Sequence, residues 1–441
     1  MNKALAKVLG AIPAGTHLVI GGTITLGLAS YIQISVAGYG LDGSARAAMS
    51  ALWSLVMTLS LGLFFPVEQE LTRVVAARVV RGEGVLPVLR RAAVLTAGLI
   101  ALIALVLALA AGPIADTFLH GQTSLIWAFA AAMLGMGLVY LTRGVLAGLG
   151  RFNAYGASLA LDGGLRIVLA GGLLAAGVHS PLAYGLVLAV SPLAAMLLTL
   201  PATLRGCLPG PAMPWSELFQ NLSAMVCASL LAQVVVNAAV LATGLLAPHD
   251  TNLQVAVLNA GVLCRVPLFV FGSLQPTLMT GLSTTATSGD RPAFHRMLVQ
   301  TCAVVGGLGL LGGVPAVLLG PWMIRVMFHA PDVLGDLDLF WFSAGTLFYM
   351  LAMVLGQALM AVRRHQAQLV AWVLGTAVLV GVIAVPGDIA TRVELSYFLG
   401  ALVTAAAMLV FLWRVPPGGA PGPAEPSAVS SGSFPLSQLP G

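Results

Sequence analysis

The stretch from Leu86 to Ala115, LPVLRRAAVLTAGLIALIALVLALAAGPIA, determines the fold class of this chain. No charged residue lies between Arg91 and Asp116, and a helix needs about 20 apolar residues to cross the hydrocarbon core of a bilayer. Backbone polar groups in hydrocarbon are satisfied only in helices or closed barrels, and a continuous apolar run lacks the alternation of a barrel strand. The stretch therefore predicts a transmembrane α-helix.

The rest of the chain has the same character. Hydrophobic residues make up 59% of the sequence and charged residues 8%, whereas a soluble domain carries about 25% charged residues. We therefore predict an all-α integral membrane protein with about twelve transmembrane helices. The apolar windows are centred near Gly27, Val56, Leu102, Met136, Leu169, Val190, Val234, Val262, Leu308, Tyr349, Ala377 and Ala405.

The basic residues predict the orientation, because cytoplasmic loops accumulate Lys and Arg. If the N-terminus is cytoplasmic, most of the basic residues near the ends of the spans lie on the cytoplasmic side. Arg46, Arg325 and Arg392 are the exceptions and fall on the outer side. Both termini are then cytoplasmic, and the net charge of +5 is an orientation signal rather than a nucleic-acid footprint. Acidic residues gather in the predicted outer loops: Asp42, Asp116, Asp250, Asp332, Asp336, Asp338, Asp388 and Glu394.

A weak internal repeat divides the chain. FFPVEQELTRVVAARVVRGEGVLPVLRR starts at Phe64 and FVFGSLQPTLMTGLSTTATSGDRPAFHR at Phe269, and each crosses an amphipathic stretch to end on basic residues. A similar offset places Arg151 opposite Arg364. This repeat predicts two six-helix lobes, 1–207 and 208–415, related by a pseudo-twofold axis along the membrane normal, with a cleft between them. Residues 416–441, rich in Pro, Gly and Ser, are predicted to form a disordered cytoplasmic tail.

Arg265 is the main candidate for a binding residue. It lies within VAVLNAGVLCRVPLFVFG, several residues from either end of that span, where a cation costs roughly 2.5 to 3.5 kcal/mol on insertion scales. Facing the cleft, it would present a fixed cation to an anionic group such as phosphate. The alternative is a side chain that reaches the cytoplasmic side or pairs internally.

Amide side chains accompany Arg265 in the apolar spans. We expect them to bind hydroxyl-rich sugars, although interhelical hydrogen bonds explain each one separately as well. The substrate-binding candidates of this kind are Gln33, Asn237, Asn259 and Gln275, with Gln233 in the same span as Asn237.

A second group of charges is predicted near the cytoplasmic mouth. Glu70 and Arg73 have the i,i+3 spacing of a helical ion pair, with Glu68 beside them. Arg143 and Arg166 flank the loop between spans four and five. These residues are candidates for a gate, and the alternatives are an intralobe salt bridge and ordinary positive-inside anchoring.

The sequence lacks the common motifs of enzymes and metal sites. No GxxxxGK loop, HExxH pattern or GxSxG elbow occurs. The cysteines show no CxxC pairing: Cys207, Cys227, Cys264 and Cys302. We expect no catalytic residue, no metal and no cofactor, and the sequence leaves open whether H⁺ or Na⁺ is a coupling ion.

A family resemblance adds to these observations. The two lobes, the amphipathic stretch after span two and the turn GVLAGLGRFNAYG, from Gly144 to Gly156, resemble polysaccharide flippases of the multidrug/oligosaccharidyl-lipid/polysaccharide (MOP) superfamily. The resemblance implies export of an undecaprenyl-pyrophosphate-linked oligosaccharide across a bacterial cytoplasmic membrane by alternating access, with Arg265 as the cavity cation. It also implies partners: membrane lipids and a polysaccharide polymerase or glycosyltransferases, but no nucleic acid.

Other functions stay open. Cation-coupled drug exporters of the same superfamily commonly carry a carboxylate in the first span, and GTHLVIGGTITLGLASYIQISVAG has none. Peptidoglycan lipid-precursor flippases usually have fourteen spans. Major-facilitator transporters share twelve spans but favour a short loop after span two. A membrane scaffold for cell-wall assembly, without transport, is the alternative from another class.

Overall fold

A computed structural model describes residues 15–268, 290–328, 333–362 and 364–414, together with Phe271, Leu282 and Thr285. The regular elements among these residues are helical. The first half contains α2 (Thr16–Gly40), α3 (Gly43–Leu59), the π-helical turn η1 (Ser60–Phe64), α4 (Phe65–Val80), α5 (Leu86–Phe118), α6 (Ser124–Gly148), α7 (Phe152–Ala175) and α8 (Pro181–Leu204). The second half contains α9 (Trp215–Leu246), α10 (Thr251–Cys264), α12 (Arg291–Phe328), α13 (Asp336–Ala361), α14 (His365–Ala384) and α15 (Ile389–Trp413).

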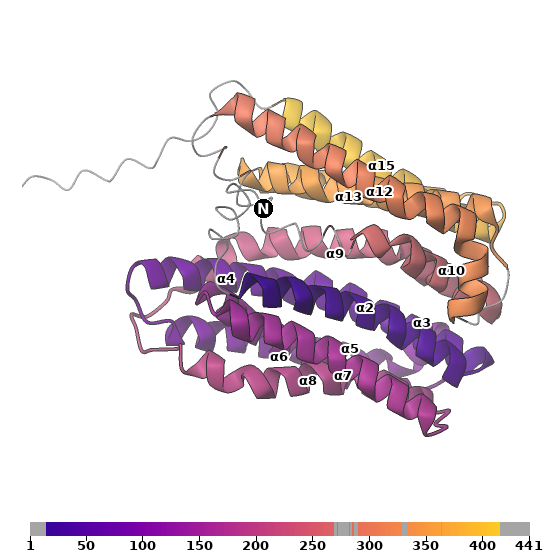
Figure 1. The fold of residues 1–441 in the computed structure, drawn as a ribbon, viewed down its shortest axis with the longest axis horizontal. Helices are drawn as coiled ribbons and strands as arrows, with labels where there is room; N and C mark the ends of the chain where they lie inside the picture. The colour runs from indigo at the N-terminus through magenta and orange to yellow at the C-terminus, as the bar shows by residue number, and fades with distance from the viewer. Residues whose placement is uncertain are drawn as a thin grey trace, which may run out of the picture.

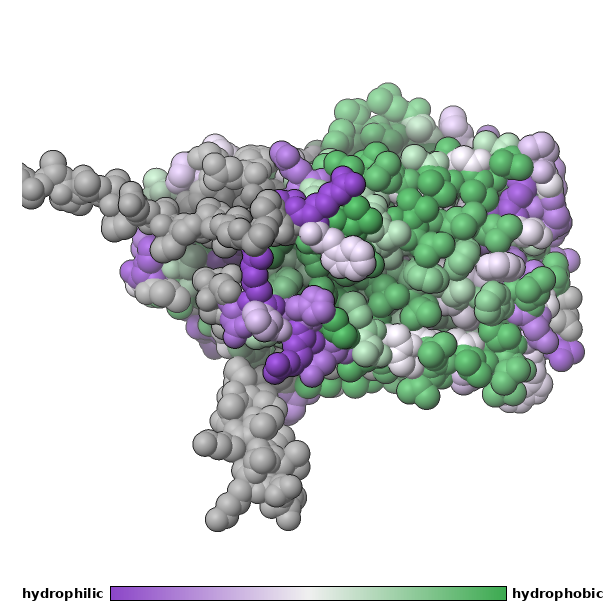
Figure 2. All heavy atoms as spheres, turned by 90° about the horizontal axis from the view of Figure 1, so that it is seen from above, coloured by the Kyte–Doolittle hydropathy of each residue, from purple (hydrophilic) through white to green (hydrophobic). Residues whose placement is uncertain are grey.

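The helices form a multi-pass membrane protein. Eleven described helices are long and apolar enough to cross a bilayer, and α10 is a shorter apolar helix. Large apolar side chains such as Leu109, 78% exposed, point outward as lipid-facing residues do. Figure 2 shows a broad hydrophobic surface between two hydrophilic margins. The prediction of an all-α membrane protein is confirmed.

The helices lie side by side in two lobes (Figure 1). We call helices α2 to α8 the N-lobe and helices α9 to α15 the C-lobe, following the predicted boundary. Helix α9 contacts α3, η1 and α4 of the N-lobe as well as α14 and α15 of its own lobe. We call the end of the bundle that carries Arg151, Arg205 and Arg291 the basic end, and the end that carries Asp250 and Asp388 the acidic end.

The amphipathic stretch after span two is helical, as the i,i+3 spacing of Glu70 and Arg73 predicts. It is continuous with span two, because α3, η1 and α4 run on as one span from Gly43 to Val79. The π-helical turn lies between the apolar half and the amphipathic half. Charged residues such as Glu68 and Glu70 are buried along this helix.

The internal repeat has a structural counterpart. Arg151 and Arg364 each precede a helix, α7 and α14, with φ/ψ of −82°/58° and −101°/54°. The Arg151 amide donates to the Leu146 carbonyl at 2.9 Å, and the Arg364 amide donates to the Leu359 carbonyl at 2.8 Å. The two halves therefore turn at corresponding residues in the same way, whereas the exact lobe boundaries stay a prediction.

Small residues bring α2 and α7 close together. A Cβ on Gly156 would lie 2.4 Å from the Leu18 backbone, and one on Gly163 would lie 2.8 Å from the Leu26 backbone. Such contacts exclude any side chain larger than hydrogen and let the two helix backbones touch. This packing holds the first helix against the N-lobe.

The connection between the lobes is docked on the N-lobe. The Leu86 amide donates to the Leu208 carbonyl at 3.0 Å, and Arg78 Nη1 donates to the Pro211 carbonyl at 2.8 Å. Gly84 lies so close that a Cβ there would be 1.9 Å from the Pro209 carbonyl oxygen. The connection, residues 205–214, is thus held against the N-lobe at Leu208, Pro209 and Pro211, at the basic end.

Candidate functional site

Arg265 lies where the eighth span breaks. Helix α10 ends at Cys264, and Arg265 is its C-cap with φ −90° and ψ 1°. Two residues later, Pro267 lacks a backbone donor, which weakens helical continuity at this point. The helix ends in the interior of the protein, because Arg265 is only 7% exposed.

The guanidinium of Arg265 is held by α9. Its Nη1 donates to Asn237 Oδ1 at 3.0 Å, and its Nη2 donates to the Val236 carbonyl. Asn237 is oriented in turn by its Nδ2, which donates to the Gln233 carbonyl at 3.1 Å. The structure therefore brings together two of the predicted binding residues, Arg265 and Asn237.

The charge of Arg265 is not balanced by a carboxylate among the described residues. No salt bridge between described residues includes it, and its Nε has no acceptor among them. Buried charges are ordinarily paired because an apolar surrounding does not solvate them. The site is therefore a fixed cation suited to an anionic ligand.

Three tyrosines lie near this cation: Tyr31 of α2, Tyr349 of α13 and Tyr397 of α15. The Tyr397 hydroxyl lies 3.1 Å from Thr346 Oγ1. Since α10 contacts α3 of the N-lobe, the cation lies where the two lobes meet. Sequence reasoning missed these tyrosines, because an aromatic residue in an apolar span gives no signal of its own.

Two of the other predicted binding residues, Gln33 and Asn259, are among the described residues. Gln33 is 0% exposed, and neither amide atom has a partner among the described residues. Asn259 is buried in α10. No described hydrogen bond joins either one to Arg265, and Gln275 lies outside the described residues. Their roles stay predictions.

A second charged cluster is buried in the N-lobe. Asp162 accepts from Arg143 Nη2 at 3.0 Å and from Arg166 Nε at 2.9 Å. Arg143 also donates to the Ser158 hydroxyl at 3.2 Å. Arg166 was expected beside the loop between spans four and five, but α7 begins at Phe152 and places it deep in the helix. The two arginines therefore lie inside the lobe, paired with one carboxylate.

The charged residues of α4 form the ion pair that their i,i+3 spacing predicts. Arg73 Nε donates to Glu70 Oε2 at 2.9 Å, the i,i+3 ion pair that was predicted. Glu68 accepts from the Tyr155 hydroxyl at 2.9 Å and so links α4 to α7. Both carboxylates are buried. These contacts tie helices within the N-lobe, and a gating role stays a prediction.

One acid was placed wrongly from the sequence. Glu394 was expected in an outer loop, but α15 begins at Ile389, after the capping residue Asp388, so Glu394 lies in its second turn and is fully buried. Neither carboxylate oxygen has a hydrogen-bond partner among the described residues. The start of α15 shows that Glu394 belongs to the helix and not to the loop before it.

The chain has relatives of similar length in mycobacteria. No protein-family model matches the chain. An uncharacterised protein of Mycobacterium tuberculosis is 26% identical over 433 residues, which cover 94% of this chain and 95% of that protein. An uncharacterised protein of Mycobacterium bovis is 27% identical over 429 residues, covering 92% and 94%.

Solved structures of transporters, not of enzymes, match over most of the chain. An inward-facing MATE family multidrug resistance transporter of the MOP superfamily has a TM-score of 0.69 at 14% identity, covering 89% of this chain and 93% of that one. A eukaryotic MATE transporter has a TM-score of 0.68 at 14% identity, covering 91% and 96%. The chain therefore has the two-lobe fold of the MATE transporters of the MOP superfamily.

Proposed function

We propose that this protein is a transporter that moves a pyrophosphate-linked lipid saccharide across a bacterial cytoplasmic membrane by alternating access. The observation that carries the proposal is Arg265, a buried cation between the lobes without a carboxylate partner among the described residues. A pyrophosphate would offset this charge and accept hydrogen bonds from the guanidinium. The transporter fold of the structural neighbours supports the alternating-access part of the proposal.

The amides fit the saccharide part of such a substrate. Asn237 is bound to Arg265, so a sugar near the pyrophosphate would meet an amide beside the cation. Gln33 offers a donor and an acceptor that the described residues leave unused. A buried polar group without a partner is costly, and a hydroxyl-rich ligand or water would satisfy it.

Multidrug export is the second candidate, because the structural neighbours include multidrug transporters. A binding site for organic cations would need negative charge where the substrate lies. Helix α2, Thr16–Gly40, carries neither Asp nor Glu, and the charge at α10 is positive. These two features favour an anionic substrate over a cationic drug.

Reconstituted vesicles test the proposal. A fluorescent pyrophosphate-linked polyprenyl saccharide should move between leaflets with the wild-type protein, and Arg265→Ala should weaken its binding by about ten-fold or more, the scale of a lost charge-assisted hydrogen bond. Arg265→Lys should retain part of the activity. Arg205→Ala, an exposed arginine at the basic end, is the matched control and should behave as wild type.

Three outcomes would reject the proposal. Normal flipping by Arg265→Ala at wild-type expression would remove the cation from the mechanism. Movement of organic cations, with no movement of the lipid-linked saccharide, would favour the drug exporter. Absence of any transport, with stable co-purification of a cell-wall synthase, would favour the scaffold.

A further inference from the structure

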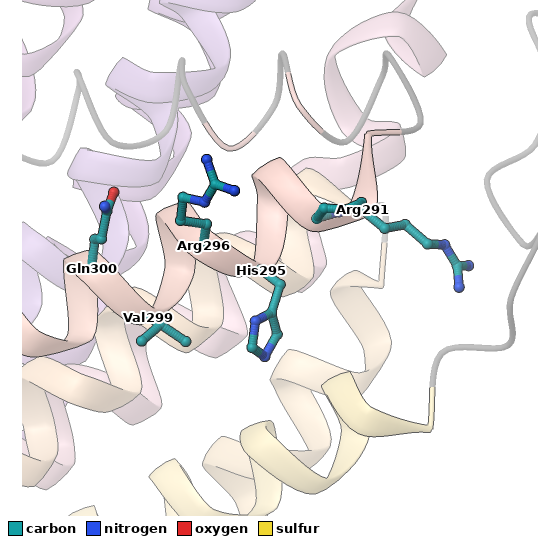
Figure 3. A pocket seen from close by; sticks show the side chains of 6 residues that line it. Arg291, His295, Arg296, Val299 and Gln300 are labelled. Carbon is teal, nitrogen blue, oxygen red and sulfur yellow. The ribbon is translucent and has the colours of Figure 1, made fainter.

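The start of α12 carries a group of cationic and polar side chains at the basic end. A hollow of about 600 Å³ lies against them, and its described lining consists of Arg291, Pro292, His295, Arg296, Val299 and Gln300. All six residues are exposed. In Figure 3, Arg296 and Gln300 extend from one side of α12, His295 and Val299 from the other, and Arg291 from the helix end.

The surroundings add positive charge. Arg364 and Arg414 stand at the same end of the C-lobe, before α14 and after α15. From α12 to α15, the described part of the basic end has one carboxylate, that of Asp290. Asp290 Oδ1 accepts from the Ala293 amide at 3.0 Å, so this carboxylate is engaged in capping α12. The rim therefore carries a net excess of cations.

An apolar stripe continues from these cations along α12. Val299, Leu310 and Val314 are exposed, and their spacing of eleven and then four residues puts them on one face of the helix. From Arg296 to Leu310 the helix rises roughly 21 Å at 1.5 Å per residue, enough to span the roughly 15 Å hydrocarbon half of one leaflet. Trp413, 76% exposed beside Arg414, is an aromatic residue of the kind that marks a membrane interface.

We propose that Arg291, His295 and Arg296 bind the headgroup of an anionic phospholipid whose acyl chains lie along the exposed apolar stripe of α12. Basic pockets at the membrane interface recognise phosphate headgroups by charge and hydrogen bonding. The site is distinct from Arg265, because its residues are exposed on the flank of the C-lobe whereas Arg265 is buried between the lobes. The occupant is a resident lipid and not the transported one.

Lipid retention tests this site in the full-length protein. We expect detergent-purified protein to keep phosphatidylglycerol in preference to phosphatidylcholine in native mass spectrometry, and added salt to reduce that preference. Arg291→Gln/Arg296→Gln should weaken phosphatidylglycerol binding by about ten-fold or more, as expected for two interfacial charges. Arg205→Gln, at the basic end of the N-lobe, should have no effect.

A charge-conserving variant guards against altered membrane insertion. Arg291→Lys/Arg296→Lys keeps the basic residues that set orientation and should retain the preference for phosphatidylglycerol. Equal retention of both lipids by the wild type, or unchanged preference in the Gln variant, would overturn the proposal and leave these cations with an orientation role alone. Displacement of phosphatidylglycerol by equimolar inorganic phosphate or by the lipid-linked saccharide would overturn it too, by assigning the site to a free anion or to the cargo.

Discussion

His120 and Gln254 join the two lobes at the acidic end. The ring Nε2 of His120, in the turn between α5 and α6, lies 2.9 Å from Gln254 Oε1 on α10. Gln254 Nε2 donates to the Ala247 carbonyl at 2.7 Å, so its oxygen faces the histidine, which then donates. A second link runs from the Tyr39 hydroxyl of α2 to the Val326 carbonyl of α12. The lobes are thus held together at this end.

Crosslinking this pair should stop transport. Alternating access requires the lobes to separate at the acidic end in one state. In a background without the native cysteines, His120→Cys/Gln254→Cys treated with a short bifunctional thiol reagent should therefore lose flipping activity in vesicles. A Leu86→Cys/Leu208→Cys pair, which joins the interlobe connection to the N-lobe, is the matched control and should stay active when bridged. Full activity of the bridged His120 and Gln254 variant would show that this contact persists through the cycle.

Removing Asp162 should destabilise the N-lobe. Asp162→Ala leaves Arg143 and Arg166 buried without their shared anion, and breaking a buried ion pair from one side costs about 3–5 kcal/mol. Thermal unfolding in detergent measures the loss. The double variant Asp162→Ala/Arg166→Leu, which removes one unpaired cation as well, should recover part of the stability. Equal stability of Asp162→Ala and the wild type would contradict the pairing.

Neighbouring glycines on α7 should respond oppositely to alanine. A Cβ on Gly163 would lie 2.8 Å from the Leu26 backbone, whereas nothing lies within 4 Å of one on Gly164. Gly163→Ala should push α2 from α7 and lower the unfolding temperature. Gly164→Ala should stabilise the protein slightly, because alanine is favoured over glycine in a helix by about 1 kcal/mol. A similar response of both variants would refute the close packing of α2 on α7.

Asp388 should make the start of α15 sensitive to acid. Its Oδ2 accepts from the Thr391 amide and hydroxyl, both at 3.0 Å, and these hydrogen bonds hold the pKa of the carboxyl below its ordinary value. The contribution of the carboxylate to stability is therefore full above a pH of about 3.9, the unfolded pKa, and is lost as the pH falls through the folded pKa.

Substitution of the cap gives the measurement. Asp388→Ala should cost about 1 kcal/mol at neutral pH, seen as a lower unfolding temperature in detergent, and the difference from wild type should shrink in acid. Asp388→Asn, which keeps an acceptor oxygen, should lose less. A constant difference at every pH would mean that the charge of Asp388 plays no part.

Much of the fold could be predicted because lipid leaves few alternatives. An apolar run such as that following Arg91 satisfies its backbone only as a helix, so most spans follow from the sequence alone. The repeat was visible because Arg151 and Arg364 mark the same turn in both halves. Helix α10 was harder, since its apolar run continues past the residue at which the helix ends.

Individual residues of the site could be predicted from the sequence, but the contacts between them could not. Arg265 was recognisable from the cost of a cation in an apolar span, and Asn237 from its amide. Their contact depends on how α9 and α10 are rotated about their axes, which a weakly amphipathic helix does not reveal. The prediction for Arg166 was wrong for a related reason. In the sequence, Asp162 and Arg166 look like the charged residues of a solvated helix end, but inside α7 the two side chains neutralise each other at an i,i+4 spacing.

The docked connection between the lobes turns a native cysteine into a sensor. Cys207 is buried within this connection, and burial raises the pKa of its thiol, so that it stays protonated and reacts slowly with maleimides. The connection, residues 205–214, is bound to the N-lobe up to Pro211. If these contacts persist while the lobes move, the hinge lies at the start of α9 and this thiol stays protected. If the connection moves with the N-lobe, Cys207 should label slowly during turnover; if the connection detaches from the N-lobe, Cys207 should label faster. This measurement uses a native cysteine and needs no introduced probe.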